Sequence, residues 1–169
     1  MMKISITPIA ESDITSFREC LDMVARERKF LAMLEAPSLD HVRDFVNENI
    51  AKNIPQFVAR EKNRVIGWCD ILPAWHQTLQ HCGALGMGIL TPYRGQGIGH
   101  QLFDACRSHA VECGITRVEL EARADNLHAI GFYKKLGFEY EGTKRHGMKV
   151  DGQYIDTIVM GLLLDTRGD

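Results

Sequence analysis

The sequence lacks long apolar runs and a strong net charge, and each absence excludes a class of protein. No stretch of the 169 residues approaches the ~20 consecutive apolar residues that a membrane-spanning helix needs. The N-terminus, residues 1–5, has no apolar core of a secretory signal peptide. The net charge of −2 gives no reason to expect nucleic acid or an anionic membrane as a partner. We therefore expect a cytoplasmic protein that binds neither.

The cysteines do not form a pattern typical of disulfides or of zinc. There are five of them, an odd number, and no two have C-x-x-C spacing. The seven histidines also lack metal-ligand spacing, so we expect no metal site. We expect each cysteine to act as a small, buried hydrophobic residue. The five positions are Cys20, Cys69, Cys82, Cys106 and Cys113.

The composition is that of an ordinary globular protein. Hydrophobic residues make up 45% of the chain and charged residues 25%. A chain of 169 residues is long enough to bury a substantial core, so we expect one domain over residues 1–169.

The apolar patterning predicts a mixed α/β protein with helices on both faces of its sheet. We expect strands at residues 3–8, 56–60, 64–72, 82–90 and 117–122. We also expect a hairpin in which residues 138–140, continuing after Gly142, pair with residues 154–164 across an Asp151-Gly152 turn. We expect helices at residues 14–24, 38–50, 97–113 and 126–136. The order is then β-α-α-β-β-β-α-β-α-β-β. The last strand is apolar on both faces, which predicts a central strand that is covered on both sides.

A glycine-rich turn between an expected strand and helix is the most informative stretch. It reads Arg94-Gly95-Gln96-Gly97-Ile98-Gly99. Glycines at every second position leave no Cβ in the way, so several backbone N–H groups can converge on one anion. The start of the following helix adds further donors and the positive end of its dipole. The turn therefore predicts a phosphate or pyrophosphate site, with Arg94 as a fixed positive charge.

Two common phosphate motifs do not fit this turn. The Walker pattern places Lys-Ser/Thr after its last glycine, whereas His100 and Gln101 follow here. The dinucleotide fingerprint needs G-x-G-x-x-G in an early βαβ unit, and this turn lies beyond the middle of the chain. A purely structural glycine-rich turn remains the alternative.

The R-x-x-G-x-G sequence resembles the acetyl-CoA pyrophosphate loop of the GNAT N-acetyltransferase superfamily. A second block, residues 126–138, matches the N-x-x-A-x-x-F-Y-x-K-x-G-F pattern of that superfamily and stands one strand after the turn. The expected order of elements is also that of the GNAT fold. The resemblance covers nearly the whole chain, and it implies an N-acetyltransferase with acetyl-CoA as cosubstrate.

The resemblance also implies roles for individual residues. The backbone from Met87 to Leu90 would bind the pantetheine arm, the glycine turn would hold the pyrophosphate, and Asn126 would hydrogen-bond the arm. Tyr133 would lie beside the thioester sulfur and protonate the leaving thiolate; a plain core aromatic is the alternative. The implied cofactor-binding residues are Met87, Ile89, Leu90, Arg94, Gly95, Gln96, Gly97, Ile98, Gly99, Asn126, Ala129, Phe132 and Tyr133.

The general base is the point at which the sequence departs from the family pattern. GNAT enzymes often carry a Glu on the strand before the pyrophosphate loop, and residues 84–88 contain no carboxylate. Asp70 on the preceding strand is one substitute, and Glu119 or Glu121 on the next strand are others. Each can equally be an ordinary strand charge, and a water relay or an already neutral amine would need no base. No cysteine stands in a nucleophile–base motif, which favours direct attack of the amine.

The acceptor is expected to contact residues 27–34 and the hairpin around residues 146–154. Glu27, Glu35 and Asp70 are candidates to bind a cationic amine, with solvated surface charge as the alternative. The leading hypothesis is transfer of acetyl to a primary amine of a small molecule, an amino acid or another amine. The alternatives are a protein N-terminus or lysine as acceptor, or a non-catalytic acyl-CoA-binding module. Family analogy leaves room for a homodimer.

Overall fold

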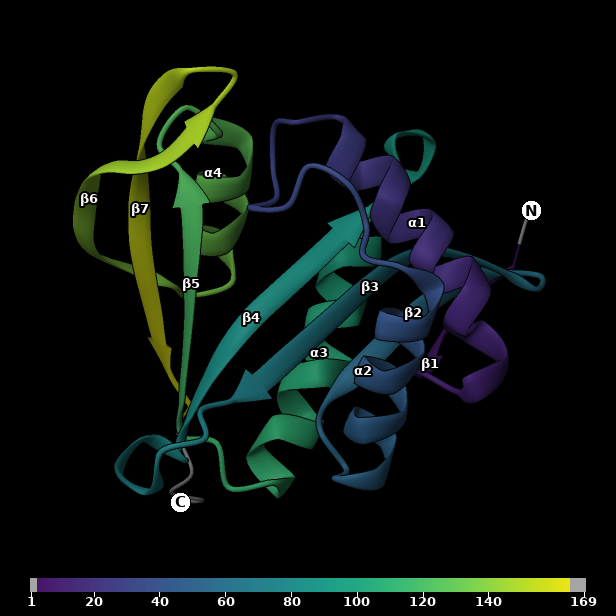
Figure 1. Cartoon of the computed structure of the whole chain (residues 1–169). Helices are drawn as coiled ribbons and strands as arrows, with labels where there is room; N and C mark the ends of the chain where they lie inside the picture. The colour runs from purple at the N-terminus through teal and green to yellow at the C-terminus, as the bar shows by residue number, and fades with distance from the viewer. Residues whose placement is uncertain (1–2, 165–169) are drawn as a thin grey trace.

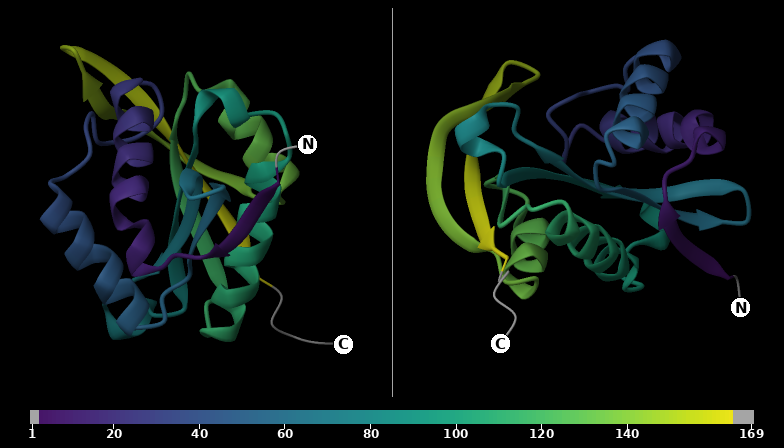
Figure 2. Two further views of the ribbon diagram at one scale, coloured as in Figure 1. Left: turned by 90° about the vertical axis from the view of Figure 1, so that its right-hand side faces the viewer. Right: turned by 90° about the horizontal axis from the view of Figure 1, so that it is seen from below.

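The computed structural model describes residues 3–164, which form one seven-stranded sheet with helices on both faces (Figures 1 and 2). The strands are β1 (Ile4–Pro8), β2 (Gln56–Glu61), β3 (Arg64–Pro73), β4 (Cys82–Ile89), β5 (Arg117–Arg123), β6 (Glu139–Val150) and β7 (Gln153–Leu163). The helices are α1 (Ile14–Arg26), α2 (Leu39–Ala51), α3 (Ile98–Glu112) and α4 (Leu127–Lys135). The predicted mixed α/β class and the predicted order of helices and strands are both confirmed.

The sheet has the order β1-β2-β3-β4-β5-β7-β6, and every neighbouring pair is antiparallel except β4 and β5. Helices α1 and α2 cover one face, and α3 and α4 cover the other (Figure 2). The helix ends follow local signals. Ser38 caps α2 by accepting a hydrogen bond from the His41 N–H. Gly114 follows α3 with a φ of 82°, a conformation that ends helices and favours glycine.

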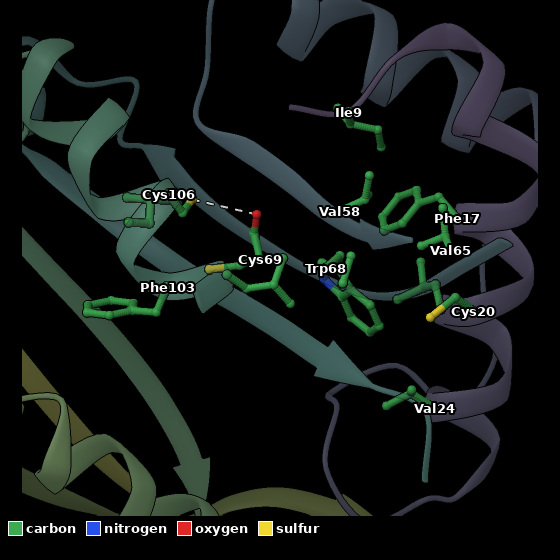
Figure 3. Packing of buried hydrophobic residues seen from close by; sticks show 14 of the residues in the cluster. Ile9, Phe17, Cys20, Val24, Val58, Val65, Trp68, Cys69, Phe103 and Cys106 are labelled. Atoms are coloured by element: carbon green, nitrogen blue, oxygen red, sulfur yellow. Dashed lines mark hydrogen bonds between the residues drawn. The ribbon is translucent and has the colours of Figure 1, made fainter. Parts of the chain in front are cut away.

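Strand β3 lies at the centre of the core, because both of its faces are packed (Figure 3). On the α1 side, the rings of Phe17 and Trp68 meet edge to face at 5.8 Å. On the α3 side, the Cys106 thiol donates to the backbone carbonyl of Cys69 at 3.6 Å. Residues 65–71 are consequently buried without interruption.

Strands β4 and β5 are neighbours along only a short part of their length. They pair over Cys82–Ala84 and Arg117–Glu119, and then diverge toward their C-terminal ends (Figure 1). Strand β4 continues to Ile89, still paired with β3 on its other side. Residues 85–89 are only half-buried, although the strand stands in the middle of the sheet. This half-buried stretch presents a free strand edge toward β5.

Two expectations are corrected by the structure. Strand β7 is not central: it lies between β5 and the edge strand β6, because the tight turn at Asp151 and Gly152 folds β6 back onto it. Apolar residues on both faces of a strand indicate that both faces are covered, but they do not show how many strands lie beyond it in the sheet. Of the cysteines, Cys113 is exposed and Cys82 is half-buried, because each lies at the end of its element; the other three are buried as expected.

Among residues 3–164, no helix is both long and apolar enough to cross a membrane. Within the same range, no group of three or more His, Cys, Asp or Glu side chains is arranged to hold a metal ion.

Candidate active site

The glycine turn places two residues in the left-handed region of backbone conformation. Gly95 has a φ of 74° and Gly97 a φ of 79°, and Gly97 is the N-cap of α3. A Cβ on either residue would meet no atom within 4 Å, so the backbone conformation and not crowding is what favours glycine here. The turn leads directly into the first N–H groups of α3, which is the geometry expected of an anion site.

Gly99 is needed for a different reason, because three elements meet at its Cα. A Cβ at this position would lie 3.1 Å from Phe132 of α4, 3.3 Å from Ile89 of β4 and 3.6 Å from Met87 of β4. Residues that the resemblance implicates in cofactor binding are thus brought together from β4, α3 and α4. Helix α4 has no fully buried residue, so this cluster is partly open.

Arg94 makes contacts that the sequence did not predict. Its guanidinium forms a two-pronged ion pair with Glu27, at 2.6 Å and 3.0 Å, and its Nε donates to the Ile89 carbonyl at 2.8 Å. It also lies over the Phe30 ring, 4.8 Å from the ring centroid. The sequence assigned Arg94 to the pyrophosphate and Glu27 to the acceptor. The structure places the two side chains against each other, and this contact ties the start of the loop after α1 to the glycine turn.

Asn126 and Tyr133 lie on α4, on the other side of the site. The Asn126 side-chain oxygen caps the helix by accepting from the Ala129 N–H at 3.2 Å. Its Nδ2 has no hydrogen-bond partner among residues 3–164 and can still donate to a ligand. The Tyr133 ring packs between Phe132 and Phe138, at 5.6 Å and 5.8 Å. Burial, and to a lesser extent the nearby Cys69, raises the pKa of Tyr133, so its hydroxyl stays protonated at neutral pH.

Asp70 is a buried carboxyl group on the opposite, α1/α2 face of the sheet. Its exposed fraction is 6%, and within residues 3–164 it has neither a hydrogen-bond nor an ion-pair partner. It pairs with Gly86 of β4 in the strand register. Its Oδ1 lies 2.8 Å from the place that a Cβ on Gly86 would take. Burial raises the pKa of Asp70 from 3.8 to about 7, into the range of a general base at neutral pH.

The other candidate carboxylates all have cationic partners. Glu119 pairs with Arg117 at 3.4 Å, and Glu121 pairs with Lys144 at 2.6 Å. Glu35 pairs with Arg26 at 3.4 Å and is 72% exposed, and within residues 3–164 no ion pair or hydrogen bond joins it to Asp70 or Glu27. Among the residues named as base or acceptor ligand, Asp70 is therefore the one whose charge is not compensated within the described chain.

A link that the sequence did not signal holds the loop after α1 against the β6–β7 hairpin. Arg28 forms an ion pair with Asp151 in the hairpin turn, with Nε and Oδ2 3.2 Å apart. Arg123 of β5 donates to the Arg28 carbonyl at 2.8 Å. Arg28 and Asp151 are 123 residues apart, so no local pattern could have paired them. In Figure 1 the loop reaches from α1 toward the diverging ends of β4 and β5.

Known proteins resemble this chain in sequence and in structure. An L-amino acid N-acetyltransferase from Escherichia coli is 30% identical over 111 residues, which cover 63% of this chain and 67% of that protein. N-alpha-acetyltransferase 30 from Schizosaccharomyces pombe is 35% identical over 83 residues, 48% of this chain. The chain spans only 55% of the length of that relative.

A Salmonella typhimurium acetyltransferase, solved with its cofactor acetyl-CoA, superposes with a TM-score of 0.89 over 98% of this chain and 96% of that one. At 16% identity, that likeness shows the fold alone. The family match is more direct: residues 21–138 match the acetyltransferase (GNAT) family. These residues include the open edge of β4, the glycine turn and the block from Asn126 to Phe138. The chain belongs to the acetyltransferase (GNAT) family.

Proposed function

We propose that this acetyltransferase moves the acetyl group of acetyl-CoA to the primary amine of a small molecule, by direct attack of the amine on the thioester. The observation that carries the proposal is Asp70, a buried carboxyl group without a protein partner, which lies over Gly86 on the strand whose edge is open to the donor. It supplies the base that strand β4 itself lacks.

The donor would lie along three structural features. The free edge of β4 from Leu85 to Ile89 can hydrogen-bond the amide groups of the pantetheine arm. The glycine turn and the first turn of α3 can hold the pyrophosphate. The unpartnered Asn126 Nδ2 can donate to the arm from the side of α4. Bound acetyl-CoA supplies the activated thioester; the remaining steps belong to residues of the chain.

Two residues account for the proton transfers of the proposed reaction. The amine nitrogen forms a bond to the carbonyl carbon, and Asp70 accepts the proton that this nitrogen must lose. The bond from carbon to sulfur then breaks, and the thiolate takes the Tyr133 hydroxyl proton. Asp70 and Tyr133 return to their starting states by exchanging one proton with solvent. The raised pKa of Tyr133 keeps its hydroxyl protonated at neutral pH until the thiolate forms, although it also makes this hydroxyl a weaker acid than that of a free tyrosine.

The contacts around the acceptor side favour a small amine over a protein. Residues 27–37 are fixed at their start to the glycine turn through Glu27 and Arg94, and to the hairpin through Arg28 and Asp151. These links tie the loop to the site at both ends of its first part, and we expect a fixed loop there to leave less room for an extended peptide than for a small amine. The E. coli relative, an L-amino acid N-acetyltransferase, supports an amino acid as the first acceptor to try.

The test is an acetyl-CoA consumption assay with purified protein and a panel of amino acids, polyamines, aminoglycosides and short peptides. We expect turnover with at least one small amine, and a loss of about 10²-fold in kcat for Asp70→Asn with acetyl-CoA binding retained. Turnover of peptides alone would overturn the choice of acceptor. Binding of acetyl-CoA without turnover of any amine would overturn the enzymatic proposal and identify an acyl-CoA-binding module.

A further inference from the structure

A row of buried polar side chains crosses the sheet next to the proposed base. Gln56 of β2, Asp70 of β3 and Gly86 of β4 are direct cross-strand neighbours. Gln56 is 2% exposed, and Asn49 of α2, which is 4% exposed, donates its Nδ2 to the Gln56 Oε1 at 2.9 Å. The row therefore extends from the inner face of α2 to the open strand β4.

The Asn49 hydrogen bond fixes the orientation of the Gln56 amide. Because the Gln56 Oε1 faces Asn49, the Nε2 is turned to another side, where it is buried without a hydrogen-bond partner among residues 3–164. Directly opposite residues in an antiparallel pair have Cβ atoms about 5 Å apart, and the residue opposite Gln56 is Asp70. A buried donor without a partner thus lies beside the Asp70 carboxyl group, and leaving that donor unsatisfied costs free energy unless something joins it to an acceptor.

We propose that Gln56 is a positioning residue for Asp70: its Nε2 donates, through one bound water, to the Asp70 carboxylate, and Asn49 fixes the amide in the orientation that makes this possible. The inference rests on Asp70 as the base of the proposed reaction. A bridging water fits because the two side chains make no direct hydrogen bond, and because a buried water needs two to four polar partners.

The contact opposes the effect of burial on Asp70. A donor favours the ionised carboxylate and lowers its pKa, whereas burial raises it. Few other titratable groups face Asp70. Strand β4 offers Gly86 at this position, and the α1 residue Cys20 has a thiol pKa that burial raises to about 12. Cys69 points to the other face with a thiol pKa that is also raised by burial. The paired charges of α2 are exposed and neutralise one another: Asp40 with Arg43, and Glu48 with Lys52.

The test is a ¹³C NMR titration of the Asp70 carboxyl carbon, combined with the pH profile of kcat/KM. Gln56→Leu should raise the Asp70 pKa by about one unit and move the acid limb of the profile to higher pH by the same amount. Gln56→Leu leaves the Asn49 amide without its partner, so Asn49→Leu/Gln56→Leu is the second variant, in which both partners become apolar. The control is Asn47→Leu, which removes a half-buried amide of α2 whose Oδ1 also lacks a partner but which lies outside the buried stripe Val42, Val46 and Asn49, and it should move neither quantity.

The outcomes separate this inference from the proposed function. An unchanged Asp70 pKa in both Gln56 variants would overturn the inference. A lowered pKa would also overturn it, since it would mean that Gln56 presents its oxygen to a protonated Asp70. Full activity of Asp70→Asn would overturn the base assignment itself, whatever the Gln56 variants show. If Gln56 had a merely structural role, the variants would lose activity at every pH, and neither the acid limb of the kcat/KM profile nor the Asp70 titration would move.

Discussion

The carboxyl group of Asp70 occupies the space that a side chain on Gly86 would take, with Oδ1 2.8 Å from the position of a Cβ there. The two residues are direct partners in the β3–β4 register. The resemblance to GNAT enzymes implies a carboxylate on the strand before the pyrophosphate loop, and residues 84–88 of β4 contain none. In this chain a carboxylate reaches the surface of β4 from the neighbouring strand, and the glycine leaves room for it.

Gly86→Ala should therefore reduce activity without weakening donor binding. The added methyl group would push the Asp70 carboxylate away, and we expect kcat to fall at least about tenfold while the Kd for acetyl-CoA stays near that of the wild type. Steady-state kinetics and calorimetry measure the two quantities. Gly142→Ala is the matched control, because a Cβ at that position in β6 meets nothing within 4 Å. Equal losses in both variants would contradict the steric explanation.

Asp70→Asn should stabilise the protein at alkaline pH, although it removes the proposed base. Burial raises the Asp70 pKa from 3.8 to about 7, so the folded state binds a proton that the unfolded state has lost between these values. The free energy of unfolding of the wild type therefore falls as pH rises through this window. At 1.36 kcal/mol per pKa unit, the neutral variant gains at most about 4 kcal/mol above pH 7 and nothing below pH 4.

Urea unfolding at pH 5 and at pH 8.5 measures this gain. Asp125→Asn is the control, because the Arg123 guanidinium lowers the pKa of Asp125 and the gain should be absent. A gain for Asp70→Asn that does not depend on pH would contradict the linkage argument.

Tyr133→Phe should separate the chemical step from donor binding. Phenylalanine keeps the packing against Phe132 and Phe138 but removes the proton donor. We expect kcat to fall by about 10²-fold with the Kd for acetyl-CoA unchanged. Because the Tyr133 pKa is raised, the wild type should show no alkaline loss of kcat below pH 10. Wild-type kcat in Tyr133→Phe would show that the residue is only a core aromatic.

Glu27→Gln should tighten the binding of acetyl-CoA. The ion pair with Glu27 neutralises Arg94, whose side chain is 30% exposed, and an uncompensated Arg94 is free to meet the pyrophosphate. We expect the Kd to fall about fivefold, or ~1 kcal/mol. Acetyl-pantetheine, which has no pyrophosphate, is the control ligand and should bind both proteins equally. An equal gain for both ligands would assign the effect to the loop and not to Arg94.

The order of the helices and strands and the prediction of a donor site at the glycine turn both follow from local sequence patterns. The order of helices and strands follows from apolar periodicity and from caps such as Ser38. The glycine turn can be recognised in the sequence because positions 95 and 97 adopt a backbone conformation that favours glycine. The block from Asn126 to Phe138 lies within one helix and its end, so the spacing of its residues can be read directly from the sequence.

Which carboxylates are paired and which one is not becomes visible in the folded structure alone. Asp70, Glu119 and Glu121 are alike in sequence, since each is an acidic residue on a strand. Strand register and burial set them apart: Arg117 and Lys144 neutralise the two glutamates, whereas Asp70 is enclosed beside Gly86 and Gln56. The contacts of Glu27 with Arg94 and of Arg28 with Asp151 join residues far apart in the chain. Such pairings depend on how the folded elements meet, which no local pattern records.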